Sequence, residues 1–165
     1  SKTESKFTIT DTVENQGDTD SPVMILYHMN MGYPLLSESS IVDIPSAEVT
    51  PRNDHAAKDL DTWAKMLPPT PGFEEQCYSH TFEKEAKASI YNPDINKGLT
   101  ISFDKDVLDH LTEWKLMGYR DYVLGLEPSN CALVGRANLR KSGQLKFLKP
   151  GEKQTFTVKV ELTEK

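Results

Sequence analysis

The sequence has few cysteines, no long apolar run and no block of basic residues. Its 165 residues include only Cys77 and Cys131, which are far apart and form no CxxC pair, so neither a disulfide framework nor a cysteine zinc site is predicted. We expect both thiols to be unpaired and at least half-buried, in a reducing compartment. No apolar run approaches the roughly 18 residues of a membrane helix, and the polar N-terminus has no signal-peptide core. These absences predict a cytoplasmic protein with no membrane partner.

The charge balance argues against nucleic acid as a partner. The chain carries 25 acidic and 19 basic residues, for a net charge of −6, and its lysines and arginines are dispersed. A polyanion-binding protein normally concentrates basic residues on one surface. The sequence also shows no spacing of ligands that indicates a metal site.

Length and patterning predict one all-β domain over residues 1–165. Short segments that alternate apolar and polar residues, separated by Gly, Pro and Asn turns, are typical of an antiparallel β-sandwich and not of βαβ units. Hydrophobic content is 37%, low for a compact globule, which suggests a part of a larger sandwich. We predict about nine strands, over residues 7–13, 22–29, 75–82, 86–91, 99–103, 111–114, 122–127, 144–148 and 155–162.

Two local features qualify this strand pattern. The turn residues 14–18 predict a hairpin that joins the first two strands. Between residues 37 and 71 the pattern loosens around five prolines, and only residues 56–66 have helical spacing, with Asn53 or Asp54 available as the cap. A long loop of this kind on a β scaffold either carries a binding surface or is a packed insertion.

The most informative stretch is an apolar run that contains a histidine close to a turn. Residues 23–29 read as a buried strand containing His28, followed by Asn30, Gly32 and Pro34. A strand fixes such a side chain and the following turn exposes it to a ligand. The alternative is a core or interface histidine that hydrogen-bonds a backbone carbonyl.

A second strand ends in a carboxylate. Residues 122–127 form a short apolar strand whose last residue is Glu127, and Pro128 marks an edge or exit because it has no N–H to donate. A carboxylate in this position is either solvated or functional.

These segments together resemble a known family. The motifs lie at residues 26–36 (LYHMNMGYPLL), 113–118 (EWKLMG), 125–130 (GLEPSN) and 148–152 (LKPGE). In order and spacing they are similar to the galactose mutarotase-like, or aldose 1-epimerase-like, proteins, and most of all to an uncharacterised branch known as a domain of unknown function. The resemblance runs from about Phe7 to Leu162 and covers only the C-terminal half of the family's usual length.

The resemblance implies a sugar-binding isomerase that needs no cofactor. Interconverting the anomers of an aldose requires one base at the anomeric hydroxyl and one acid at the ring oxygen. In the mutarotases the histidine matching His28 is the general acid and the glutamate matching Glu127 is the base. The family has a further histidine in its N-terminal half, which this chain does not contain.

Four other residues are candidates for substrate binding. Asn30 could hydrogen-bond a sugar hydroxyl, or it could simply form the turn. His80 could face the same cleft, Trp114 could stack on a sugar ring instead of packing in the core, and Arg120 could grip an acidic group instead of a neighbouring carboxylate.

Two further functional readings remain open. The same residues could bind a carbohydrate without turning it over, as a non-catalytic β-sandwich module. The chain could also be a structural fragment that pairs with a second copy through exposed sheet edges.

Overall fold

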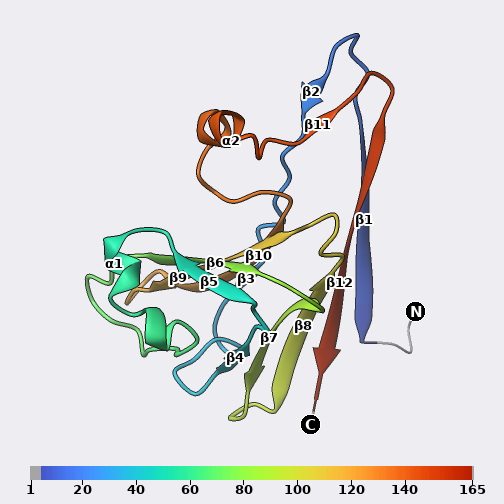
Figure 1. The fold of residues 1–165 in the computed structure, drawn as a ribbon. Helices are drawn as coiled ribbons and strands as arrows, with labels where there is room; N and C mark the ends of the chain where they lie inside the picture. The colour runs from blue at the N-terminus through green and yellow to red at the C-terminus, as the bar shows by residue number, and fades with distance from the viewer. Residues whose placement is uncertain (1–4, 165) are drawn as a thin grey trace.

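Two five-stranded antiparallel sheets pack around one hydrophobic core (Figure 1). The structure is a computed structural model that describes residues 5–164. The first sheet has the order β1 (Lys6–Glu14), β12 (Lys153–Thr163), β8 (Lys97–Phe103), β7 (Ala86–Asn92) and β4 (Ile41–Asp43). The second sheet has the order β3 (Asn30–Met31), β10 (Tyr122–Ser129), β9 (His110–Met117), β6 (Gln76–Thr81) and β5 (Glu48–Pro51). A small ribbon of β2 (Ser21–Pro22) and β11 (Phe147–Leu148) lies at one end, near the helix α2 (Arg136–Ser142).

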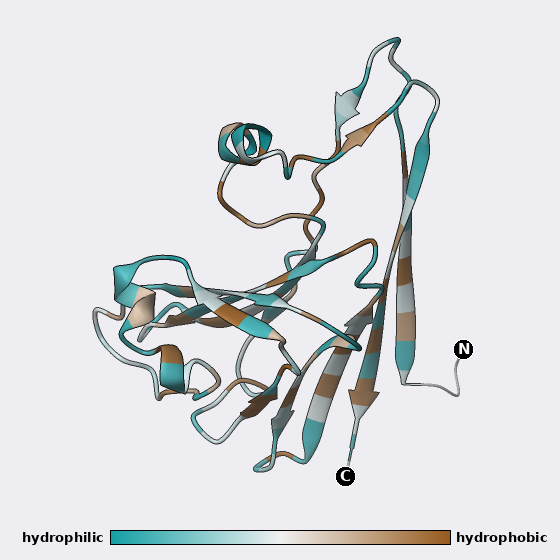
Figure 2. Ribbon diagram, viewed as in Figure 1, coloured by the Kyte–Doolittle hydropathy of each residue, from teal (hydrophilic) through white to brown (hydrophobic). Residues whose placement is uncertain are grey.

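The core forms because strand residues alternate between an inward and an outward face. Along β7 every second residue, from Ala86 to Asn92, is buried. Figure 2 shows this alternation as hydrophobic and hydrophilic bands along the long strands. The two sheets share one cluster of buried residues, which includes Ile90, Ile101, Phe156, Val158 and Val160 from the first sheet and Met31, Leu111, Met117, Leu124 and Leu126 from the second.

The antiparallel sandwich predicted from the sequence is confirmed. The strands predicted over residues 7–13, 75–82, 86–91, 99–103, 111–114, 122–127 and 155–162 correspond to β1, β6, β7, β8, β9, β10 and β12. Only the last two residues of the strand predicted over 144–148 are a strand, β11. The sequence did not predict the short strands β4 and β5, which lie inside the proline-rich stretch.

The predicted hairpin between the first two strands is wrong. β1 pairs along its whole length with β12, with Lys6 opposite Glu161 and Glu14 opposite Lys153. The chain leaves β1 at Asn15, whose backbone exchanges hydrogen bonds with Glu152 and Gly151, and whose side chain donates to the Leu148 carbonyl. These contacts hold the end of β1 to the turn before β12. The other side of β1 is an edge of the sheet.

The strand predicted over residues 22–29 is also wrong as a continuous element. The regular strands are β2, which ends at the first residue of this segment, and β3 after it; between them only Leu26 forms an isolated bridge, with Ser129. The segment nevertheless runs beside β10, because the Tyr27 N–H donates to the Pro128 carbonyl and the Leu126 N–H donates to the Met29 carbonyl. Proline has no N–H to continue a ladder, so the pairing at Pro128 is irregular.

The helix predicted over residues 56–66 is reduced to α1 (Asp54–Ala57) and the 3-10 turn η1 (Leu60–Thr62). The predicted cap is confirmed at Asn53, whose side chain accepts a hydrogen bond from the Ala56 N–H at 2.9 Å. Beyond η1 the carbonyls of Trp63 and Lys65 accept hydrogen bonds from the buried Lys115 ammonium group. The main chain at these two residues therefore bonds to Lys115 instead of continuing the helix.

α2 was not predicted from the sequence. Its last turn is closed by Gly143, which has a φ of +73° and donates its N–H to the Arg140 carbonyl. Leu139 of α2 packs with Leu145 and Cys131. Cys77 and Cys131 are both free and buried, as predicted. Within residues 5–164, no helix has the length and apolar character needed to cross a membrane.

Candidate functional site

The candidate site lies on the face of the second sheet that points away from the core, which we call the open face. Residues directly opposite one another in antiparallel strands place their side chains on the same face. Glu127 of β10 is opposite Thr112 of β9, which is opposite Ser79 of β6, which is opposite Thr50 of β5. These four residues form one row across the sheet, the Glu127 row.

A neighbouring row crosses the same face one step along the strands. Gly125 is opposite Asn30 on one side and Trp114 on the other, and Trp114 is opposite Cys77. The Arg52 N–H donates to the Cys77 carbonyl, which continues the row past the end of β5. The two rows thus place the Glu127 carboxylate, the Trp114 indole, the Cys77 thiol and the Arg52 guanidinium on the open face.

His28 and Glu127, which we call the dyad, meet at the edge of this face. His28 Nε2 lies 3.1 Å from Glu127 Oε1, while the side chain of His28 is 53% exposed and that of Glu127 only 3%. The contact is not an aligned hydrogen bond, and Oε1 is buried without a hydrogen-bond partner. Burial raises the pKa of the Glu127 carboxyl above its ordinary value, and the adjacent His28 partly opposes this rise.

A buried asparagine holds the segment that carries His28. The Asn130 side chain accepts a hydrogen bond from the Ile25 N–H at 2.9 Å and donates one to the Val23 carbonyl at 3.1 Å. Together with the backbone contacts to Leu126 and Pro128, this fixes residues 23–29 beside β10. The histidine is therefore presented by an irregular segment that a neighbouring strand supports, and not by a strand of its own.

Gly125 makes room for the Glu127 side chain. A Cβ atom built on Gly125 would lie 2.4 Å from Glu127 Oε1 and 3.3 Å from the Trp114 Cβ. Real Cβ atoms do not approach an oxygen so closely, so any other residue at this position would displace the carboxylate. The absence of a side chain at Gly125 is thus part of the geometry of the site.

Trp114 connects the dyad to a charged network. Its ring contacts His28 edge to face with ring centroids 5.6 Å apart, and its Nε1 donates to Glu75 Oε2 at 2.9 Å. Glu75 lies 3.6 Å from Arg52, which in turn donates to the Cys77 sulfur at 3.5 Å. Burial raises the pKa of the Cys77 thiol, and Arg52 opposes this rise. The network orients the indole against His28.

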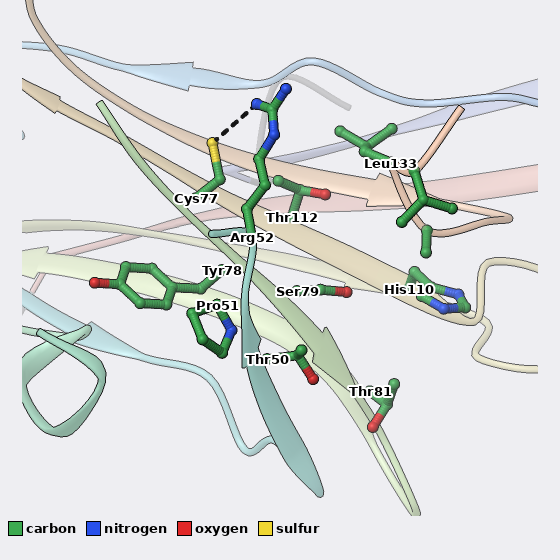
Figure 3. A pocket seen from close by; sticks show the side chains of 12 residues that line it. Thr50, Pro51, Arg52, Cys77, Tyr78, Ser79, Thr81, His110, Thr112 and Leu133 are labelled. Atoms are coloured by element: carbon green, nitrogen blue, oxygen red, sulfur yellow. Dashed lines mark hydrogen bonds between the residues drawn. The ribbon is translucent and has the colours of Figure 1, made fainter. Parts of the chain in front are cut away.

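A pocket of about 260 Å³ opens on the same face beside the Glu127 row (Figure 3). Thr50, Ser79 and Thr112 of that row line it, and Figure 3 shows Arg52 reaching across to Cys77 at one side and Leu133 above the strands. Leu133 belongs to the loop that follows β10. The pocket therefore adjoins the dyad through Thr112.

The structure brings together His28, Glu127, Asn30 and Trp114 of the residues singled out from the sequence. It does not bring His80 or Arg120 to them. His80 is fully buried on the core face of the sheet, where Nδ1 contacts the Ser46 hydroxyl at 2.7 Å. Arg120 lies in the turn between β9 and β10, and the stretch of β10 from Tyr122 to Glu127 alone spans about 17 Å at the usual rise of an extended strand.

Sequence reasoning missed Glu75, Arg52, Cys77, Thr112 and Ser79 as residues of the site. Their proximity depends on strand register, which no local pattern in the sequence shows. Within residues 5–164, no group of three or more histidine, cysteine or acidic side chains is placed to hold a metal ion.

A family model described as "Domain of unknown function (DUF4432)" matches residues 1–162. No curated protein matches the sequence. Among solved structures, a candidate aldose 1-epimerase from Klebsiella pneumoniae subsp. pneumoniae MGH 78578 matches with a TM-score of 0.90 and 29% identity, over 98% of this chain and 44% of that chain.

Two more distant structures share the fold. A galactose mutarotase-like protein from Clostridium acetobutylicum matches with a TM-score of 0.63 and 19% identity, over 96% of this chain and 52% of its own. A candidate aldose 1-epimerase from Escherichia coli K12 matches with a TM-score of 0.67 and 17% identity, over 98% of this chain and 57% of its own. The chain thus spans about half the length of these proteins.

Proposed function

Because the chain belongs to the DUF4432 family and shares its fold with mutarotase-like proteins, we propose that it binds an aldose and interconverts its anomers by acid–base catalysis. Glu127 is the base and His28 the acid. The observation that carries this proposal is the 3.1 Å contact between His28 Nε2 and Oε1 of Glu127, which is buried and accepts no hydrogen bond.

The reaction needs two proton transfers at oxygens bonded to the same carbon. Glu127 takes the proton of the anomeric hydroxyl, the C–O bond to the ring oxygen breaks as the carbonyl forms, and His28 protonates the ring oxygen. Rotation about the adjacent C–C bond and the reverse steps give the other anomer. Since both oxygens are attached to the anomeric carbon, the acid and base must be close neighbours, as these two side chains are.

The environment of each group supports its role. A base works best when its pKa lies near the working pH, and burial raises the pKa of Glu127 in that direction. His28 is half-exposed, so it can exchange protons with solvent between turnovers. Trp114 and Asn30 flank the pair on the open face and are proposed to contact the sugar.

Replacing His28 with asparagine tests the acid. Two-dimensional NMR exchange between α and β anomers, measured across a panel of aldoses, is expected to be faster with the wild type than in buffer for at least one sugar. In His28→Asn this acceleration should fall by about 10²–10⁴-fold, the usual contribution of one acid–base group. His55→Asn is the matched control, since His55 contacts Glu74 outside the site. Equal rates for wild type and buffer with every sugar would refute the proposal.

Replacing Gly125 with alanine tests the position of the base. The new Cβ would force the flexible Glu127 carboxylate to move, so anomer exchange is expected to fall by about 100-fold while the free energy of unfolding changes by only about 1 kcal/mol. Gly32→Ala is the control, because a Cβ at Gly32 has no neighbour within 4 Å. Unchanged exchange in Gly125→Ala would show that the position of this carboxylate does not matter.

A further inference from the structure

The Glu127 row connects the proposed reaction centre directly to the pocket. Adjacent strands are about 4.8 Å apart, so Thr112 is one strand and Ser79 two strands away from Glu127. A sugar whose anomeric carbon is held against Glu127 and His28 can extend along this row. Its ring then lies over Thr112 and Ser79, both of which line the pocket.

The size of the pocket fits one sugar ring or part of one. Its volume of 260 Å³ is below the range of about 300–1,000 Å³ typical of sites for drug-sized ligands. The pocket therefore suits a monosaccharide and not a long oligosaccharide.

The polar groups of the pocket include three hydroxyls that no other protein group engages. Within residues 5–164, the hydroxyls of Thr50, Ser79 and Thr112 make no hydrogen bond to another side chain or to the backbone. A hydroxyl can both donate and accept. These three groups come from three neighbouring strands and match the mixed donor and acceptor pattern of a sugar ring.

The far wall of the pocket is carbon-rich. It is formed by Ala132, Leu133 and Val134 of the loop after β10, and Leu133 and Val134 remain 44% and 52% exposed. Figure 3 shows Leu133 on the side of the pocket opposite Thr50. An apolar group on the ligand would cover these side chains, whereas a hydroxyl or a charged group there would lose water without gaining a partner.

The basic side chains that line the pocket already contact acidic groups or a thiol. Arg52 lies 3.6 Å from Glu75 and donates to Cys77, and His110 Nδ1 lies 3.0 Å from Asp109. Among the described lining residues, Arg52 is the only lysine or arginine. A phosphate or carboxylate on the sugar would therefore find no uncompensated cation.

We infer that the pocket holds the end of the sugar remote from its anomeric carbon and selects an uncharged, deoxygenated group there, as in a 6-deoxyhexose. The inference rests on the proposed function, because it takes the anomeric carbon to lie at His28 and Glu127. It assigns the substrate class of the site: a neutral 6-deoxy aldose in preference to the corresponding hydroxylated or phosphorylated sugar.

Matched sugar pairs test the substrate class with the 165-residue chain. Anomer exchange is measured by NMR for D-galactose, D-glucose and L-mannose beside their 6-deoxy counterparts, and for D-glucose 6-phosphate. In at least one pair we expect kcat/KM to be about 10-fold higher for the 6-deoxy sugar, with the phosphate slowest of all. Saturation transfer from the protein should be strongest at the C6 methyl group of the preferred sugar.

Leu133→Asn tests the wall itself. This variant should reduce the preference for the 6-deoxy sugar to about twofold or less, because the methyl group loses its apolar partner. Leu162→Asn is the control, since Leu162 is similarly exposed on β12 in the other sheet, and it should keep the wild-type preference.

The outcomes separate this inference from the proposed function. Equal or greater exchange of the hydroxylated or phosphorylated sugar in every pair would overturn the inference while anomer exchange itself stands. An unchanged preference in Leu133→Asn would also overturn it. If no sugar exchanges faster with the protein than in buffer, both the proposed function and the inference are overturned.

Discussion

Glu127→Gln is expected to lower the acceleration of anomer exchange by about 10²–10⁴-fold while leaving the fold intact. Glutamine keeps the shape of the side chain in the space beside Gly125 but cannot accept the proton of the anomeric hydroxyl. The measurement is NMR exchange between anomers, with the sugar on which the wild type acts. Retained exchange in Glu127→Gln would exclude this residue as the base.

The same substitution is expected to leave thermal stability unchanged or to increase it. Burial raises the pKa of Glu127 in the folded protein, so the folded state disfavours the charged form. For a carboxyl whose folded pKa is above its unfolded pKa, stability is highest below the unfolded pKa and is lost as pH rises through the folded pKa. The gain in the melting temperature of Glu127→Gln should therefore be greatest at neutral and alkaline pH and vanish in acid.

The pH dependence of the wild type follows from the same shift. The base must be deprotonated to act, so the acid limb of the rate profile should lie above the ordinary glutamate range near about 4.3.

A lower melting temperature for Glu127→Gln at neutral pH would indicate that the carboxylate stabilises the fold. A sugar that binds Glu127→Gln and the wild type equally, without exchange in either, would instead favour a carbohydrate-binding module.

Much of the sandwich follows from local patterns in the sequence. Long strands such as β12 alternate cleanly, because one face packs on the core and the other faces solvent. The short strands β4 and β5 have three and four residues, too few for alternation to be visible. Their pairing is a consequence of the neighbouring long strands β7 and β6.

The site was only partly predictable for a different reason. The resemblance to the mutarotase-like family pointed to His28 and Glu127, which the structure places 3.1 Å apart. The contact between Trp114 and Glu75, however, joins residues 39 positions apart, and it depends on strand register. Register is set by the packing of the whole sheet, so the local sequence does not reveal it.

His80 shows how one position in register decides the environment of a side chain. Its neighbour Ser79 lies on the open face and lines the pocket, whereas His80 points into the core and contacts the ring of Trp63 with centroids 4.8 Å apart. Successive residues of a strand point to opposite faces, so a shift of one residue would have exchanged them. On the core face, His80 lies 3.7 Å from the buried carboxylate of Glu113.

The second large effect is expected at Lys115, on this core face. Lys115 is 1% exposed, and its ammonium group donates to the carbonyls of Trp63 at 2.7 Å and Lys65 at 2.9 Å. Burial lowers the pKa of Lys115, and the nearby Glu113 carboxylate opposes this. Lys115→Ala would leave two carbonyls without a donor, open a cavity and remove the cation that faces a buried carboxylate.

We therefore expect Lys115→Ala to lower the free energy of unfolding by about 3–5 kcal/mol, as is usual when one partner of a buried charged group is removed. For a chain of this length the melting temperature should fall by roughly 6–20 °C. Lys153→Ala is the matched control: its contact with Glu14 is exposed, so its cost should stay within about 1 kcal/mol. Equal melting temperatures for the two variants would contradict the expectation.

A double substitution separates the loss of the countercharge from the loss of the hydrogen bonds. Burial raises the pKa of Glu113, the nearby His80 and Lys115 oppose this rise, and neither of its oxygens has a hydrogen-bond partner. Lys115→Met keeps most of the side-chain volume but removes the positive charge near Glu113. If the countercharge dominates, adding Glu113→Gln to Lys115→Met should recover part of the lost stability, because a buried pair replaced as a whole costs less than a broken one. If the carbonyls of Trp63 and Lys65 dominate, the double variant should be as unstable as Lys115→Met alone.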